Sequence, residues 1–154
     1  MTRGEMRRQD RLMEKEELQC FLKERQVGSL GVNGSDGFPY VVPMNYCYVE
    51  DVFILHSGPQ GEKIECLRAD KKVCFSVYNC NGIVAGEEPC SYSVRYRSVT
   101  AFGKAEFPEG NEKRMWLEKF VSVFTGSGLK LKDEDVHRTK VIVLKPEAIT
   151  GRKR

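Results

Sequence analysis

Residues 38–56 read FPYVVPMNYCYVEDVFILH, and this stretch decides the fold class. Large apolar or aromatic side chains occupy every second position up to Tyr48, and a period of two is typical of a β-strand rather than of a helix. Glu50 and Asp51 then indicate a turn, and residues 52–56 are a short apolar run suited to a buried strand. The stretch therefore predicts two consecutive strands joined by a tight turn.

Pro43 lies inside the first of these strands. A proline has no backbone N–H to donate to a neighbouring strand, so it is confined to edges, bulges and other interruptions of the ladder. We therefore expect Pro43 at a sheet edge, at a bulge, or where another group approaches the backbone.

The rest of the chain predicts more strands than helices. Apolar periodicity indicates a helix near 13–25, a short helix near 63–72 and a helix after Pro108. Further strands are expected at 29–32, 73–78, 97–107 and 140–146, with an irregular stretch at 79–90 and with Pro146 ending the last strand. About six strands, mostly joined by hairpins, do not alternate with helices as in a doubly wound sheet. The pattern predicts a mainly β fold with peripheral helices, either an antiparallel barrel or a strongly curved sheet.

The composition fits one globular domain over residues 1–154, with charged tails at about 1–10 and 150–154. Of 154 residues, 40% are hydrophobic and 31% are charged, which excludes a wholly disordered or collagen-like chain. No apolar run approaches the roughly 20 residues that a membrane-spanning helix needs. The charged N-terminus has no apolar segment behind it, as a secretory signal would. We therefore expect a cytoplasmic protein without a membrane partner.

The net charge of +3 does not indicate nucleic-acid binding. Residues 1–11 contribute +2 and residues 152–154 contribute +3, so the body between them carries −2. A basic patch on the body would be the expected mark of a nucleic-acid partner. We expect none.

Six cysteines, at positions 20, 47, 66, 74, 80 and 90, show no C-x-x-C spacing and no zinc-finger pairing with histidine. No metal site is predicted. We expect reduced thiols, most of them filling the core.

The stretch ILHSGPQGEK at 54–63 could form an anion pocket. Gly58 and Gly61 would let backbone N–H groups approach an oxyanion, Ser57 could donate its hydroxyl, and Lys63 would add charge at a helix N-terminus. An ordinary turn with a solvated lysine is the alternative. His56, at the end of the strand, could serve as an acid or base or could be a structural residue.

The stretch SYSVRYRSVTAFGKAEF at 91–107 mixes tyrosine, arginine and serine ahead of a strand. Such residues could stack on a planar ring and bind phosphate, or they could protect an exposed strand edge with charge.

Taken together, the chain resembles the FMN-binding split β-barrel proteins related to pyridoxamine 5′-phosphate oxidase, and the nitroimidazole-resistance branch in particular. The resemblance covers about residues 6–152. It rests on the order and spacing of MRRQDR, EELQCFL, VGSLGV, the strand GFPYVVPMNY, FILHSGPQGEKIECL, VCFSV, CSYSVRYRSVTAFGKA and AITGRK.

The resemblance implies a six-stranded antiparallel split β-barrel that forms a homodimer with FMN in a groove between the subunits. Cofactor-binding positions would be Pro43, Met44, Asn45, Tyr46, His56, Ser57, Gly61, Lys63, Arg97, Ser98 and Val99, with His56 also the catalytic candidate. One departure stands out: relatives often carry a basic residue before the lysine, whereas this chain has Glu62, which we expect to point to solvent.

The implied activity is an FMN-dependent oxidoreductase that reduces a small planar acceptor such as a nitroaromatic. A non-catalytic protein that binds a flavin or haem on the same barrel is the alternative. The chain is shorter than true pyridoxamine-phosphate oxidases and lacks a recognisable form of their substrate-binding segment, so we do not expect that activity.

Overall fold

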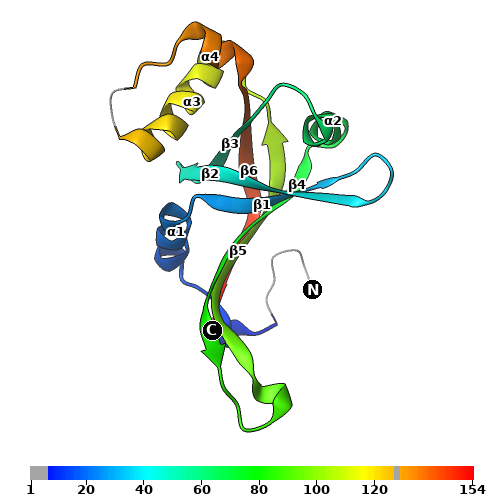
Figure 1. Ribbon diagram of the computed structural model, residues 1–154, viewed down its shortest axis with the longest axis vertical. Helices are drawn as coiled ribbons and strands as arrows, with labels where there is room; N and C mark the ends of the chain where they lie inside the picture. The colour runs from blue at the N-terminus through cyan, green and yellow to red at the C-terminus, as the bar shows by residue number, and fades with distance from the viewer. Residues whose placement is uncertain (1–6, 127–128) are drawn as a thin grey trace.

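Six antiparallel strands close into a barrel in the computed structural model, which describes residues 7–126 and 129–154 (Figure 1). Around the barrel the order is β1-β2-β3-β6-β5-β4. The strands are β1 (Val27–Asn33), β2 (Pro39–Val49), β3 (Val52–Ser57), β4 (Lys72–Val84), β5 (Ser93–Glu106) and β6 (Lys140–Lys153). This architecture confirms the predicted mainly β, six-stranded antiparallel split barrel.

The helices lie at the periphery of the barrel. They are α1 (Lys15–Glu24), α2 (Glu62–Ala69), α3 (Gly110–Thr125) and α4 (Asp133–Arg138), with short 3-10 turns η1 (Gln9–Arg11) and η2 (Pro89–Ser91). Helices α1, α2 and α3 match the three predicted ones. None of the helices in the described parts of the chain is long and apolar enough to cross a membrane, which agrees with the absence of a long apolar run in the sequence.

Aromatic side chains fill the barrel interior. Tyr46, Phe53 and Phe75 are fully buried, and their ring centroids lie 5.1–5.6 Å apart in tilted or edge-on pairs. The hydroxyl of Tyr46 donates to the carbonyl of Leu22 at 2.8 Å, which ties the end of α1 to the barrel and satisfies a buried polar group.

A second apolar core lies outside the barrel, beneath α3. Trp116, Leu117 and Phe120 of this helix pack on the outward side chains of three strands, among them Cys47, Ile54, Val141 and Val143. Because one face of β2 and β3 points into the barrel and the other points under α3, these strands are apolar on both faces near this end.

The sheet is split along β2. Residues 39–45 of this strand pair with β1, whereas pairing with β3 begins only at Tyr46. Pro43 therefore lies on a stretch of β2 that pairs along one edge, as its missing donor requires. This confirms the edge position as the explanation for the proline.

The last strand is longer than predicted. β6 does not stop at Pro146 but continues to Lys153, because the β5–β6 register shifts between Phe102 and Gly103 and accommodates the proline at that irregularity. A side chain at position 103 would meet the carbonyl oxygen of Lys145 at 2.1 Å, so only glycine fits there.

The expected C-terminal tail is also part of this strand. Residues 150–153 pair with β5, and Arg154 exchanges backbone hydrogen bonds with Tyr96. Of the expected N-terminal tail, residues 1–6 lie outside the described residues, while Gln9–Arg11 form η1 and Leu12 bridges to Arg152.

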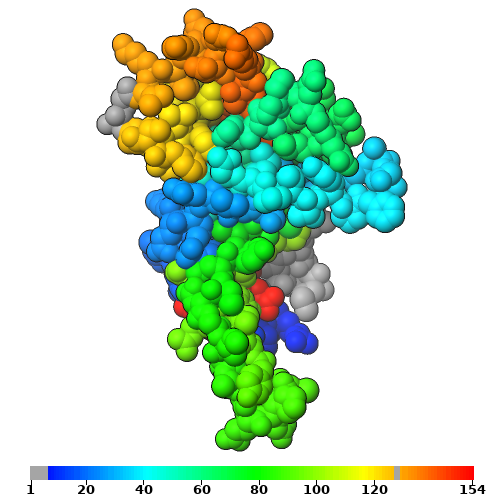
Figure 2. Space-filling view, viewed as in Figure 1, coloured from blue at the N-terminus to red at the C-terminus, as the bar shows by residue number. Residues whose placement is uncertain are grey.

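β4 and β5 extend well beyond the barrel. The stretch 79–90, which we expected to be irregular, continues β4 to Val84 and then forms η2, and β5 begins at Ser93. The two strands form a two-stranded ribbon that projects from the body (Figures 1 and 2). We call residues 78–96 the arm.

The cysteines differ from the expectation that most fill the core. Cys47 and Cys66 are buried and Cys74 is half-buried, whereas Cys20, Cys80 and Cys90 are exposed. All six thiols are free of disulfides.

Candidate functional site

The open stretch of β2 presents two of the predicted residues to the outside. Pro43 and Asn45 are exposed. The residue that follows each of them, Met44 and Tyr46, is buried in the barrel core. This alternation follows from the period-two geometry of a strand. Only backbone groups of Met44 and Tyr46 can therefore reach a ligand on the outer face, while Pro43 and Asn45 can offer side chains.

His56 joins Asn45 on this outer face. Its Nε2 lies 3.5 Å from the side-chain nitrogen of Asn45, and its ring packs edge-on against Phe120 of α3 with centroids 4.7 Å apart. Burial lowers the pKa of His56 below its ordinary value of 6.5. The imidazole is therefore neutral near pH 7, with one N–H donor and one acceptor nitrogen.

We expect an NMR titration of the imidazole signals to give His56 a pKa below 6.5, with the signal assigned through its loss in His56→Gln. Phe120→Leu keeps apolar volume under α3 but removes the ring, so it should move the pKa part of the way back up. Phe124→Leu is the control, since Phe124 stacks on Phe120 rather than on the histidine.

The same shift predicts a pH dependence of stability. The unfolded chain binds the histidine proton more readily than the native state, so the free energy of unfolding should fall as the pH drops below about 6.5. A pKa of 6.5 or higher for His56 in the folded protein would contradict the buried placement.

The loop after β3 forms an open cradle at the start of α2. Gly61 immediately precedes the helix with φ +117°, a conformation that favours glycine. A Cβ built at Gly58 or Gly61 would meet nothing within 4 Å, so the space in front of this backbone is open. The first backbone N–H groups of α2 and the positive end of its dipole lie at this loop, which suits a phosphate-sized anion.

Lys63 lies in the first turn of α2 and is half-buried, whereas Glu62 beside it is exposed. Ser57, the last residue of β3, pairs with Lys140 and leads directly into the loop. Ser57, Gly61 and Lys63 thus lie on one short segment that continues from His56.

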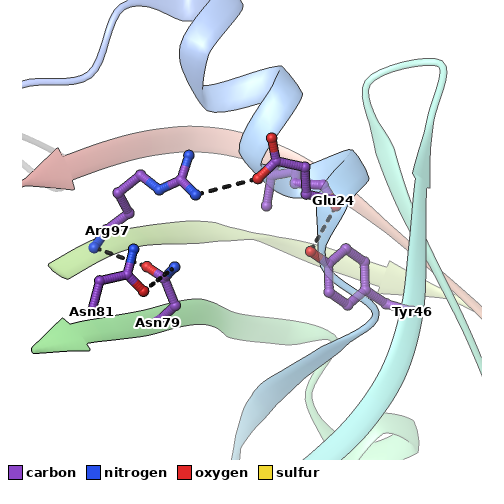
Figure 3. A network of polar contacts seen from close by, with 6 residues as sticks. Glu24, Tyr46, Asn79, Asn81 and Arg97 are labelled. Carbon is purple, nitrogen blue, oxygen red and sulfur yellow. Dashed lines mark hydrogen bonds and ion pairs between the residues drawn. The ribbon is translucent and has the colours of Figure 1, made fainter.

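The three predicted residues of β5 divide between the two faces of the sheet. Val99 is buried in the barrel core, and Ser98 lies opposite Tyr78 on the outer face. Arg97 points toward α1: its guanidinium lies 4.8 Å above the Phe21 ring and 3.3 Å from the carboxylate of Glu24, and its backbone N–H donates to Asn79 (Figure 3). The side chain of Arg97 is therefore engaged on the face opposite Pro43 and Asn45.

Phe120 is a site residue that the sequence did not single out. Apolar periodicity predicted a helix after Pro108, but not which strand its apolar face would cover. Only the placement of α3 over β3 brings Phe120 against His56.

Comparison with known proteins decides the family. The family model described as pyridoxamine 5′-phosphate oxidase matches residues 14–153, nearly the whole chain. The chain belongs to this family. No curated protein matches the chain at a significant level.

Among solved members of similar structure, one is a candidate 5-nitroimidazole antibiotic resistance protein from Bacteroides thetaiotaomicron. Its sequence is 33% identical to that of the present chain. The match covers 92% of the present chain and 84% of the resistance protein, with a TM-score of 0.79. The likeness in both sequence and fold confirms the predicted family and the similarity to its nitroimidazole-resistance branch.

Two further structures share the fold at lower identity. The flavocytochrome Anf3 from Azotobacter vinelandii has a TM-score of 0.88 at 19% identity, covering 100% of this chain and 74% of its own. An FAD- and haem-binding protein from Mycobacterium smegmatis has a TM-score of 0.82 at 21% identity, covering 91% and 71%.

Proposed function

We propose that this member of the family is an FMN-binding oxidoreductase that reduces a small planar acceptor such as a nitroaromatic. The observation that carries the proposal is the proximity of Asn45 and His56 on the outer face of the sheet, followed directly along the chain by the open loop at α2. The 33% identity to the candidate nitroimidazole resistance protein supports the choice of acceptor.

The residues present fit FMN. The open backbone at Gly58 and Gly61, the N-terminus of α2 and the half-buried Lys63 would hold the phosphate. Pro43, Asn45 and His56 would face the ring system, and Ser57 would lie between the two ends. Because Glu62 is exposed, its charge can stay in solvent.

A bound flavin supplies the hydride and electron transfer, and the protein supplies position and electrostatics. His56 is neutral near pH 7 and lies beside Asn45, so it can donate a hydrogen bond to an acceptor held over this face. Phe120 packs on one side of the imidazole and shields it from water.

We expect His56→Gln to lower turnover of a nitroimidazole with NAD(P)H by about tenfold, the loss of one hydrogen bond, with FMN uptake nearly unchanged. Steady-state rates and an FMN titration of the same preparation separate the two effects. Unchanged turnover would remove His56 from the proposed site, and absence of NAD(P)H-dependent turnover in the FMN-loaded wild-type protein would overturn the activity.

We further propose a homodimer with the cofactor at the subunit interface, located in the cytoplasm. The site supports the dimer because Pro43 and Asn45 are exposed in the single chain. Six thiols free of disulfides, three of them exposed, suit a reducing compartment.

The second candidate is a protein that holds a flavin or haem without turnover. It is favoured by the overall likeness to the flavocytochrome and to the FAD- and haem-binding protein. The visible absorption spectrum decides: a Soret band after haem addition that is lost in His56→Ala or His137→Ala would favour this reading, whereas a flavin spectrum with turnover would exclude it.

A further inference from the structure

Lys113 is a buried lysine that the proposed site does not use. It lies near the N-terminus of α3 and is 7% exposed, and it is the one charged residue that is buried in the described part of the chain. Lysine is almost never buried to this extent unless an opposite charge pairs with it. Within residues 7–126 and 129–154, no group forms an ion pair or a hydrogen bond with the amine of Lys113. Its positive charge therefore lacks a partner.

The amine of Lys113 still reaches solvent. Among the described side chains, Arg25 Nε is the one fully buried polar atom without a hydrogen-bond partner. Because the amine of Lys113 has no partner either, it must keep access to water while its apolar stem is buried. A ligand that enters from solvent can therefore reach this amine.

A second lysine lies at the same end of α3. Lys140, the first residue of β6, has a side chain that is 18% exposed and that donates to the carboxylate of Glu109 at 2.5 Å. Glu109 immediately precedes α3, so this contact brings the start of β6 to the N-terminal end of the helix (Figure 1). The pKa of Glu109 is lowered, first by the hydrogen bond from Lys140 and further by the charges of Lys140 and Lys113. Both amines therefore lie near this one carboxylate.

This end of α3 carries more positive than negative charge. Lys113 and Lys140 contribute two positive charges, and the helix N-terminus adds a partial one. Glu109 supplies one negative charge, and its side chain is 65% exposed. Glu112, the other carboxylate near the start of α3, instead accepts a hydrogen bond from the Trp116 indole at 3.4 Å. The excess positive charge favours an anion beside the two amines.

The two lysines lie just beyond His56. Lys113 precedes Phe120 by seven residues, close to two helical turns, so both side chains leave the same face of α3 about 10 Å apart along its axis. Phe120 packs on His56, and Lys140 pairs in the ladder with Ser57, the residue that follows His56. Helix and ladder therefore agree in placing the lysines next to the His56 end of the candidate site.

We propose that Lys113 and Lys140 bind a phosphate group at a site separate from the loop at α2, and that the carboxylate of Glu109 occupies this site in the free chain. Because Glu109 is mostly exposed, its side chain can turn into solvent when the phosphate enters. A phosphate monoester carries a charge of about −1.5 to −2 near pH 7 and has three acceptor oxygens, so it can pair with both amines at once.

The position of the site indicates which phosphate-bearing molecule it takes. A nicotinamide nucleotide, the electron donor in the proposed function, carries a planar ring and a phosphate in one molecule. With the ring over the outer face at Asn45 and His56, the phosphate would extend toward Lys113 and Lys140. This choice of ligand rests on the proposed function, whereas the phosphate site itself does not.

Inorganic phosphate tests the site in the absence of flavin. Isothermal titration calorimetry of the full chain should show saturable binding at millimolar concentration. Lys113→Met should weaken this binding at least about tenfold, because a charge-assisted hydrogen bond is lost while a side chain of similar length still fills the buried space. Glu109→Gln should tighten it, because the competing negative charge is removed.

The matched control is Lys145→Met. Lys145 is 56% exposed and pairs with Glu106 at 2.8 Å on the barrel, so this variant should bind phosphate as the wild type does. Lys63→Ala, at the loop of α2, should also retain phosphate binding. Absence of saturable binding, or equal binding by the wild type and Lys113→Met, would overturn the site. Binding that Lys63→Ala abolishes and Lys113→Met retains would assign the phosphate to the loop at α2 instead.

Nicotinamide mononucleotide tests the choice of ligand by the same calorimetry. It should compete with phosphate and bind more tightly than phosphate, and His56→Gln should weaken binding of the nucleotide but not of inorganic phosphate. Nucleotide binding no tighter than that of phosphate would contradict the nicotinamide assignment and leave the phosphate site in place. Phosphate binding at Lys113 by a protein that takes up no FMN would count against the proposed function alone, while FMN uptake without this phosphate site would count against the site alone.

Discussion

Phe75→Ala should lower the free energy of unfolding by about 3–5 kcal/mol, the usual cost of removing a fully buried phenylalanine. Phe75 is 0% exposed and contacts the rings of Tyr46 and Phe53 at 5.2 and 5.1 Å. The closed barrel around it cannot collapse into the space that the ring leaves. Since domains are stable by only about 5–15 kcal/mol, this single change removes a large share of the total.

Urea denaturation followed by circular dichroism measures the loss, and Phe38→Ala is the matched control. Phe38 is 74% exposed in the β1–β2 turn, so the same truncation there should change the free energy of unfolding by no more than about 0.5 kcal/mol. Equal effects of the two substitutions would contradict the barrel interior described above.

Lys63→Ala should weaken FMN binding by between about 10- and 100-fold, because a charge-assisted hydrogen bond to phosphate contributes about 1.5–3 kcal/mol. Lys63 is half-buried in the first turn of α2, beside the open loop at Gly61. The effect should be confined to the phosphate end of the ligand.

Riboflavin, which lacks the phosphate, separates this role from a general loss of structure. Fluorescence titrations should show that Lys63→Ala weakens FMN but leaves riboflavin affinity nearly unchanged. Lys23→Ala, at an exposed position in the last turn of α1, should leave both unchanged. An equal loss for both ligands would place Lys63 away from the phosphate.

Much of the barrel could be predicted because its signals are local. The period-two pattern through Tyr48, the turn at Glu50 and Asp51 and the apolar run of β3 depend only on neighbouring residues. Both turn residues adopt positive φ, at 52° and 60°, as a tight hairpin turn requires. The predicted strands and the edge position of Pro43 follow from these signals.

Features that depend on distant contacts were missed. β6 passes Pro146 because β5 shifts register opposite it, and β4 passes Gly82 because a bulge absorbs the extra residue. Neither partner strand is visible in the local sequence, so both strands were predicted too short. The arm was hidden for the same reason.

The residues of the candidate site also divide into those placed by local sequence and those placed by distant contacts. Ser57, Gly61 and Lys63 lie in one short segment, so their proximity could be predicted from the sequence. The side chain of Arg97 instead lies against Glu24 and Phe21, residues more than 70 positions earlier in the chain. Which face of β5 carries that side chain depends on the barrel register, which no local pattern encodes.

The most direct test of the central claim is a titration of the purified protein with FMN, followed by absorbance near 450 nm and by flavin fluorescence. We predict saturable binding at micromolar concentration with one FMN per chain, accompanied by a shifted and structured flavin band. Absence of binding by FMN, and by related flavins, at that concentration would contradict the account.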